Sequence, residues 1–187
     1  MEPRDTHLQL ERLAESADCL TDATAEHLAE SCVVTFSEHD HAPGVSMAFG
    51  FKGATHKVSV SWNNHATEAM LRCHRDQNKR IDNAACAIAL MLVAEFTDYH
   101  GYEQSATGDR IDYHLRSSQR DDTLIFNDTV KLEVSGIDRE SRSNTLEYRI
   151  KEKKARLDQR GGPGSNSNST YICVVEFSNP KSAMVLT

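Results

Sequence analysis

Residues 84–94, AACAIALMLVA, form an apolar run that decides the architecture of this chain. The run is too short to span a bilayer, which takes about 20 apolar residues, and its length suits a buried helix. Apolar residues at helical spacing extend the predicted helix over residues 79–99. Because residues 84–94 are apolar all round, we expect this helix to be central and covered on several sides.

Strand-like segments lie on the N-terminal side of the central helix. Three runs largely alternate apolar and polar residues between turns that carry glycine, which predicts an antiparallel meander. These runs are residues 31–36, 45–51 and 57–62. Short helices are expected over residues 5–19 and 66–75.

After the central helix the pattern predicts three strands, a helix and a last strand. The strands are expected at residues 110–115, 123–126, 130–134 and 171–177, with the helix running from about residue 138 to 159. The predicted fold class is therefore α/β (α+β). An αβββαβ core over residues 66–187 follows an N-terminal helix and β-meander lobe over residues 1–65.

Composition and charge exclude several classes of protein. The 187 residues are 39% hydrophobic and 26% charged, which is typical of a globular chain rather than a disordered or fibrous one. The net charge of −7 disfavours a uniformly basic, non-specific nucleic-acid binder. No secretory signal or membrane span is visible, and the five cysteines include no CxxC pair. We expect a cytoplasmic protein with reduced cysteines and no membrane partner.

The helix predicted near the C-terminus is the most basic part of the chain. Residues 138–160 hold eight basic and five acidic residues, which leaves the remainder of the chain at −10. A helix of mixed charge is often a solvated face held by pairs such as Glu147–Lys151 and Glu152–Arg156. The alternative is a surface that faces phosphate groups, and the sequence leaves both interpretations open.

Two acids occupy the polar sides of predicted strands. Asp112 lies in RIDYHL (residues 110–115), and Glu133 lies in VKLEV (residues 130–134), 21 residues later. If the strands are adjacent, both carboxylates converge at one end of the sheet and offer the hard oxygen ligands that Mg²⁺ or Mn²⁺ prefers. Polar residues on the solvated faces of two strands would give the same pattern without any site.

The order of elements, with Asp112 in GDRIDYHL and Glu133 in KLEVSG, resembles the PD-(D/E)XK nuclease superfamily over residues 79–187. The resemblance implies a restriction-endonuclease-like fold, with Asp112 and Glu133 as ligands of a divalent metal. It also implies a lysine two residues after Glu133 that helps to activate water, and this chain has Ser135 there.

The resemblance offers replacements for the missing lysine. Some members of the superfamily supply it from the following helix, where this chain has Arg149, Lys151 and Lys153. Arginine stays protonated and is a poor general base, so Lys153 or Lys151 is the better choice for the water and Arg149 for a phosphate. Members often add a glutamate from the preceding helix, for which Glu95 is the candidate metal ligand; a simpler interpretation is that Glu95 marks where that helix reaches water.

The histidines of Glu38-His39-Asp40-His41 form a second group of candidate metal ligands. Two histidines one residue apart could hold a transition metal, but the neighbouring Pro43 and Gly44 favour a polar loop. His114 shares the predicted polar face of Asp112 and is the one histidine expected near the acidic site.

These patterns predict a Mg²⁺- or Mn²⁺-dependent nuclease-like protein that hydrolyses phosphodiester bonds of DNA or RNA. Defence against phage or the processing of mobile DNA would fit, by analogy. Nucleic acid is the expected partner. A protein partner or a second copy of the chain would supply the affinity for nucleic acid that the acidic remainder of the chain lacks. Two alternatives are a catalytically degraded module of the same fold, which Ser135 favours, and an unrelated α+β interaction domain.

Overall fold

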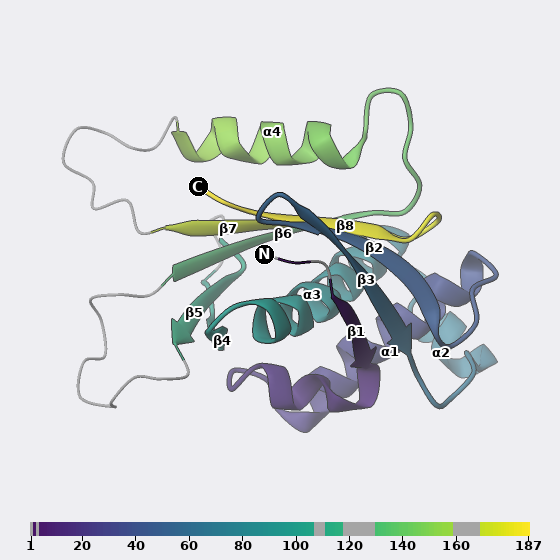
Figure 1. Cartoon of the computed structure of the whole chain (residues 1–187). Coiled ribbons are helices and arrows are strands. Elements are labelled where there is room, and N and C mark those ends of the chain that lie inside the picture. The colour runs from purple at the N-terminus through teal and green to yellow at the C-terminus, as the bar shows by residue number, and fades with distance from the viewer. Residues whose placement is uncertain (1, 3, 107–110, 118–129, 159–168) are drawn as a thin grey trace.

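The computed structural model describes residues 2, 4–106, 111–117, 130–158 and 169–187, and it places eight strands in one mixed sheet (Figure 1). Neighbouring strands follow the order β1-β3-β2-β8-β7-β6-β5-β4. Their bounds are β1 Asp5–Gln9, β2 Val45–Phe51, β3 Ala54–Ser61, β4 Tyr99–Gln104, β5 Tyr113–Ser117, β6 Val130–Ile137, β7 Thr170–Glu176 and β8 Lys181–Leu186.

Helices cover both faces of the sheet. They are the 3-10 helix η1 (Leu10–Ser16), α1 (Asp22–Glu38), α2 (Glu68–Cys73), α3 (Gln77–Phe96) and α4 (Leu146–Asp158). Figure 1 shows α4 alone on one face, with α1, α3 and η1 on the other. The mixed α/β class is therefore confirmed. Within the described ranges, no helix combines the length and the apolar character that a bilayer crossing requires.

The predicted central helix is confirmed as α3. Its first turn is capped by Asp76, whose Oδ1 accepts a hydrogen bond from Lys79 N at 3.1 Å. Residues 87–93 are all buried, as the uniformly apolar run predicts. The helix packs against β4, β6 and β7 on one side and α1 on the other, so it connects both halves of the molecule.

The N-terminal segment differs from the prediction in two places. Residues 31–36 form the buried second half of α1, not a strand. The β-branched residues Val33, Val34 and Thr35 favour a strand locally, but the cap at Thr21 starts a helix that buries the run on all sides. Residues 5–19 hold strand β1 and η1 in place of the expected helix.

The hairpin of the predicted meander is confirmed. β2 and β3 pair antiparallel through a turn at Lys52 and Gly53, where both residues have positive φ (48° and 76°). β1 then pairs parallel with β3, and β2 pairs parallel with β8. Strands from residues 1–65 and from residues 66–187 thus belong to one continuous sheet.

The described part of the C-terminal half runs α3, β4, β5, β6, α4, β7 and β8, and its first strand is not the one predicted. β4 follows α3 directly, β5 pairs antiparallel with both β4 and β6, and β6 pairs parallel with β7 across the α4 crossover. The segment predicted at 110–115 is in part the second strand, β5, and the strand predicted at 123–126 lies outside the described residues. α4 begins at Leu146 and not near residue 138: β6 continues to Ile137, and a turn closed by the Ser141–Asn144 bridge separates it from the helix.

Candidate functional site

The β5–β6 ladder ends where the candidate site begins. The last paired residues are Tyr113 on β5 and Leu132 on β6, while β6 continues beside β7 as far as Ile137. Asp112 directly precedes β5 at this fork, and its N–H donates to Leu132 O at 3.0 Å. Its side chain continues the contact, because Asp112 Oδ2 accepts from Val134 N at 2.7 Å. This geometry holds the Asp112 carboxyl beside Glu133, the residue between Leu132 and Val134.

Glu133 lies on the opposite face of β6 from its two neighbours. Leu132 and Val134 are buried in the main core with α3, as the alternating pattern predicts. Glu133 Oε1 accepts a hydrogen bond from Lys153 Nζ on α4 at 2.5 Å. The two side chains are only 14% and 13% exposed, so water screens this ion pair much less than it screens a surface pair.

Both acids line one pocket of about 320 Å³ at the fork. Its wall combines three carboxyl groups with two cationic side chains, drawn from the sheet and from helices on both faces. The lining residues are Asp82 and Cys86 of α3, Asp112, Glu133, Val134 and Ser135 of the sheet, and Arg149 and Lys153 of α4. The sequence prediction that Asp112 and Glu133 lie together is supported, and four of the five predicted catalytic residues line the same pocket.

Two carboxyl groups of this pocket, those of Glu133 and Asp82, have shifted pKa values. Desolvation raises the pKa of Glu133 above its usual value, Lys153 opposes that rise, and the Asp112 carboxylate adds to it. Desolvation likewise raises the pKa of Asp82, again with a contribution from Asp112. Carboxylates that disfavour one another's ionisation concentrate negative potential, which a bound cation would relieve.

Cys86 is a thiol of the pocket wall without the features of a nucleophile. Desolvation and then the Asp112 carboxylate raise its pKa, so it stays protonated at neutral pH. A reactive cysteine needs the opposite, a depressed pKa in an electropositive environment. For Cys86, this environment agrees with the prediction of a small core residue.

The helix acid that the structure brings to the pocket is Asp82 and not Glu95. Glu95 lies in the last turn of α3 and lines a different pocket, and its backbone oxygen accepts a hydrogen bond from the Arg4 guanidinium. Thirteen residues at 1.5 Å per residue separate the two acids by about 20 Å along the helix. Chain direction could have identified Asp82: α3 runs directly into β4, so its early turns lie toward the far end of β4, where β5 begins.

Of the other residues predicted for the site, some line the pocket and others do not. Lys151 is exposed on α4 and does not line the pocket, whereas Arg149 does, with its Nε donating to Asn144 Oδ1 at 2.5 Å. Ser135, at the position of the expected lysine, lines the pocket and is 7% exposed. His114 is half-buried on β5 and is not part of the pocket lining.

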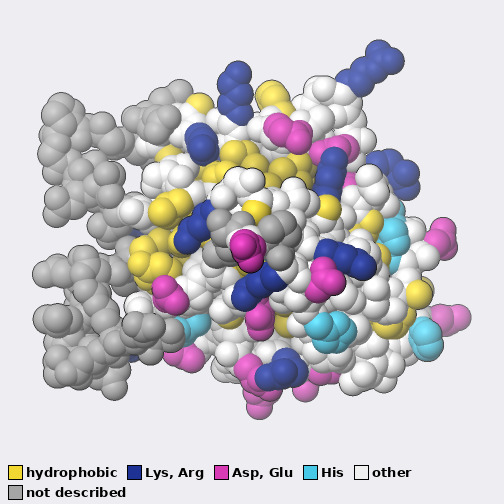
Figure 2. All heavy atoms as spheres, viewed as in Figure 1, with side chains coloured by type: hydrophobic (Ala, Val, Ile, Leu, Met, Phe, Trp, Pro, Cys, Tyr) yellow, Lys and Arg dark blue, Asp and Glu magenta, His cyan; other side chains and the backbone are white. Residues whose placement is uncertain are grey.

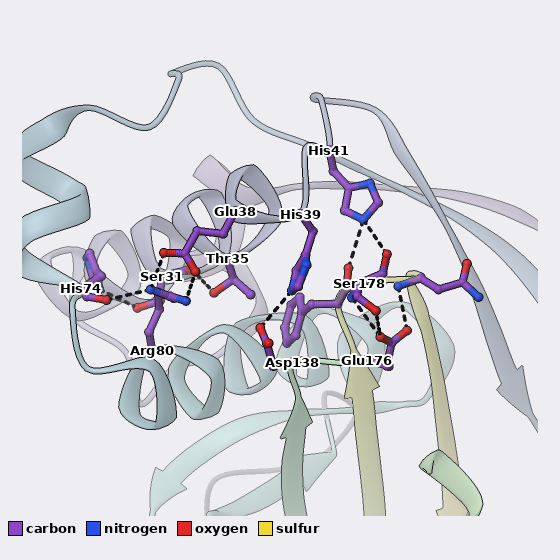
Figure 3. A network of polar contacts seen from close by, with 12 residues as sticks. Ser31, Thr35, Glu38, His39, His41, His74, Arg80, Asp138, Glu176 and Ser178 are labelled. Carbon is purple, nitrogen blue, oxygen red and sulfur yellow. Dashed lines mark hydrogen bonds and ion pairs between the residues drawn. The ribbon is translucent and has the colours of Figure 1, made fainter. Parts of the chain in front are cut away.

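The Glu38–His41 segment forms a structural network, shown in Figure 3. Glu38 pairs with the buried guanidinium of Arg80, and His39 Nε2 lies 2.9 Å from Asp138 Oδ1. His41 Nε2 is 3.1 Å from the Phe177 carbonyl oxygen. These contacts join the end of α1 to α3, to the end of β6 and to the β7–β8 turn. Glu38 is the last residue of α1, so the predicted polar loop begins only after it.

The donor set of the fork pocket fits a magnesium-type ion better than a transition metal. Mg²⁺ commonly takes one or two protein carboxylates and completes its shell with water and phosphate oxygens. Asp112 and Glu133 satisfy that requirement. Over the described ranges, no group of three or more His, Cys, Asp or Glu side chains has the spacing of a full metal-ligand set.

Comparisons with protein-family models, curated proteins and solved structures found no match for this chain.

Proposed function

We propose that this protein is a metal-dependent phosphodiesterase of the PD-(D/E)XK nuclease type, acting on DNA or RNA. The observation that carries the proposal is the shared pocket of Asp112, Glu133 and Lys153, in which a helix supplies the amine that the strand lacks at Ser135. The strand pairings around it support the same interpretation, since β4, β5, β6 and β7 follow α3 in the order expected of an αβββαβ core.

Each pocket residue has a role in this proposal. Asp112 and Glu133 would hold Mg²⁺ or Mn²⁺, and Asp82, in place of Glu95, is the helix acid that lines the same pocket. The bound ion would act as a Lewis acid on the phosphate and lower the pKa of a coordinated water. Lys153 Nζ orients the attacking water beside Glu133, and Arg149 contacts a non-bridging phosphate oxygen as negative charge develops there.

A second candidate function rests on the same ion pair. Lys153 Nζ occupies Glu133 Oε1, and a carboxylate neutralised in this way is a weaker ligand for a cation. A pocket of that kind would belong to a degraded member of the superfamily that serves as a binding module. The two proposals differ in two measurable properties, the affinity of the pocket for a divalent ion and the cleavage of nucleic acid.

Isothermal titration with Mn²⁺ tests the proposal. The wild type should bind the ion, and an Asp112→Asn/Glu133→Gln variant, which keeps the shape of both side chains, should lose that binding. The matched control is Glu103→Gln/Glu147→Gln, which removes two exposed acids from β4 and α4. Cleavage of single- and double-stranded DNA and RNA with Mn²⁺ is then measured for all three proteins. Metal binding with no cleavage of any substrate, or a folded wild type that binds no metal even with nucleic acid present, favours the binding module.

A further inference from the structure

A groove on the sheet face opposite α4 has an apolar floor. It has a volume of about 390 Å³ and runs between η1, α1 and α2. Apolar side chains from all three elements line it: Leu10, Ala14, Ala25, Ala29, Val33 and Met70. Alanines at two of the α1 positions leave space that larger side chains would fill. A volume near the lower end of the usual 300–1,000 Å³ of ligand pockets suits a few aliphatic side chains.

Acidic side chains surround this floor. The lining includes Glu11 of η1 and a row of acids on α1 spaced four residues apart, Asp22, Glu26 and Glu30. Among the residues that line the groove, all of them in described ranges, none is Lys or Arg. Several acidic side chains, with a Lys or Arg side chain among them, are visible at the lower edge of Figure 2, where Figure 1 draws the purple helices.

Within this row, Glu30 Oε2 lies 3.2 Å from Nε2 of the buried His74, and Asp22 lies in the first turn of α1; among the described residues, Glu26 is the member with no such stabilising contact. Like charges at i and i+4 destabilise a helix by about 0.2–0.5 kcal/mol per pair. The sequence of α1 has four acidic residues and no Lys or Arg that could offset this repulsion from within the helix. Only Asp22, in the first turn, gains from the helix dipole. Glu26 lies on the exposed surface between the other two acids, where a cation from outside would relieve the repulsion.

We propose that this groove binds a short, basic, amphipathic segment of a protein partner. Aliphatic side chains of the segment enter the apolar floor, and its Lys or Arg residues contact the Glu11, Asp22 and Glu26 carboxylates. An amphipathic helix laid into an apolar groove is a common way to recognise such a segment. Nucleic acid and anionic membranes do not fit, because their phosphates would meet the acidic rim.

This docking surface is separate from the pocket at Asp112 and Glu133. η1 and α1 cover one face of the sheet and α4 covers the other, so a partner in the groove leaves the α4 side open. The inference therefore stands or falls independently of the proposed metal chemistry.

The test is fluorescence anisotropy of the full chain with a labelled peptide of about 15 residues, carrying Leu at i, i+3, i+4 and i+7 and Lys elsewhere. We expect saturable binding that weakens as salt is raised, since part of it is electrostatic. Two control peptides replace every Leu by Ser or every Lys by Glu, and each should lose most of the affinity. Glu26→Lys and Ala29→Arg should each weaken binding by about tenfold or more.

Glu103→Lys is the matched control, since it makes the same charge change at an exposed acid of β4. It should leave the affinity nearly unchanged. Equal losses in Glu26→Lys and Glu103→Lys, or unchanged binding of the Leu-to-Ser peptide, would reduce the effect to non-specific charge attraction and overturn the proposal. Self-association of the wild type that Ala29→Arg abolishes would assign the groove to a second copy of this chain, which also overturns it. Circular dichroism of each variant verifies that it is folded.

Discussion

Lys153 of α4 donates a hydrogen bond to Glu133 of β6 at 2.5 Å, and this contact joins the helix on one face of the sheet to the fork in the sheet. Asp112, the residue before β5, reaches the same fork by accepting a hydrogen bond from the Val134 amide. Both interactions combine residues at least 20 positions apart in sequence, so the pocket exists only in the folded chain.

Lys153→Met should abolish metal-dependent cleavage, because it removes the amine beside Glu133 while keeping most of the side-chain volume. The loss expected from deleting one electrostatic group at a reacting centre is about 10²–10³-fold in rate. Lys151→Met is the matched control, since Lys151 is exposed two residues away on the same helix. The measurement is the initial cleavage rate of each variant at saturating Mn²⁺. Comparable rates in both variants would show that Lys153 has no part in the proposed reaction.

A lysine introduced at position 135 of β6 should restore part of the cleavage activity that is lost when Lys153 is removed. Ser135 lines the pocket on the same side of β6 as Glu133, two residues further along the strand. In a Lys153→Ala background, the shortened side chain leaves room for Ser135→Lys. The double variant should cleave at least about tenfold faster than Lys153→Ala alone, a gain typical of one positioned proton-transfer or charge-stabilising group. A double variant no faster than the single one would show that a cation at this position does not serve the reaction.

The sequence predicted the parts of this molecule that depend on periodicity. The apolar run of residues 84–94 identified α3, and the alternation around Glu133 identified the face of β6 that points toward α4. Local signals were insufficient for residues 31–36, where strand-forming Val33 and Val34 lie inside a buried helix. A fully buried run has no polar face, so its period cannot distinguish the two structures.

The candidate site was predictable to the extent that it depends on strand order. Glu95 and Asp82 lie on the same helix, and only the direction of α3 relative to β4 decides which of them approaches Asp112. The choice between Lys151 and Lys153 depends in turn on the rotation of α4 about its axis. Both are properties of tertiary packing, which one sequence does not specify through spacing alone.

Asp82→Asn should stabilise the protein at neutral pH. The pKa of Asp82 is raised in the folded state, so the stability it contributes is present below its ordinary pKa of 3.8 and is lost as pH rises through the raised value. Asparagine mimics the neutral form, and the melting temperature of the variant should exceed that of the wild type at pH 7 and match it near pH 3. Asp5→Asn, at an exposed position of β1, is the control for the removal of one negative charge.

If Asp82 contributes to the metal site, the wild type should melt at a higher temperature than Asp82→Asn when Mn²⁺ is present. A bound ion stabilises the wild type in proportion to its affinity, and the loss of one carboxylate reduces that gain. Melting curves with and without Mn²⁺ at pH 7 separate the two effects. An equal Mn²⁺-induced shift in wild type and Asp82→Asn would exclude Asp82 from the site.

Gly136→Ala should destabilise the protein and disturb the pocket together. A Cβ at this position of β6 would contact the Ile81 Cγ2 and lie 2.7 Å from the Ile81 carbonyl oxygen, and backbone cannot move aside cheaply. Overpacking of this kind costs about 1–3 kcal/mol in the free energy of unfolding. Gly50→Ala is the control, because its nearest neighbour would lie at 3.6 Å. Urea titration of both variants measures the difference in the free energy of unfolding. A displaced Ile81 would also move Asp82, the next residue of α3, which lines the pocket. The affinity for Mn²⁺ should therefore fall in Gly136→Ala and not in Gly50→Ala.

Glu38→Gln should cost about 1–3 kcal/mol in the free energy of unfolding, because it leaves the guanidinium of Arg80 buried without a counter-charge. Arg80 is 4% exposed and its two terminal nitrogens donate to both oxygens of Glu38, which is itself 42% exposed and so partly screened by water. Glu15→Gln breaks the pair with Arg12 on the surface, where both side chains are at least 60% exposed and water screens the pair, so it should cost clearly less than Glu38→Gln. Urea unfolding of the two variants gives the comparison, and equal losses would show that burial of Arg80 does not matter. An Arg80→Met/Glu38→Gln double variant should lose less than the two single variants combined, because the unpaired charge is then gone.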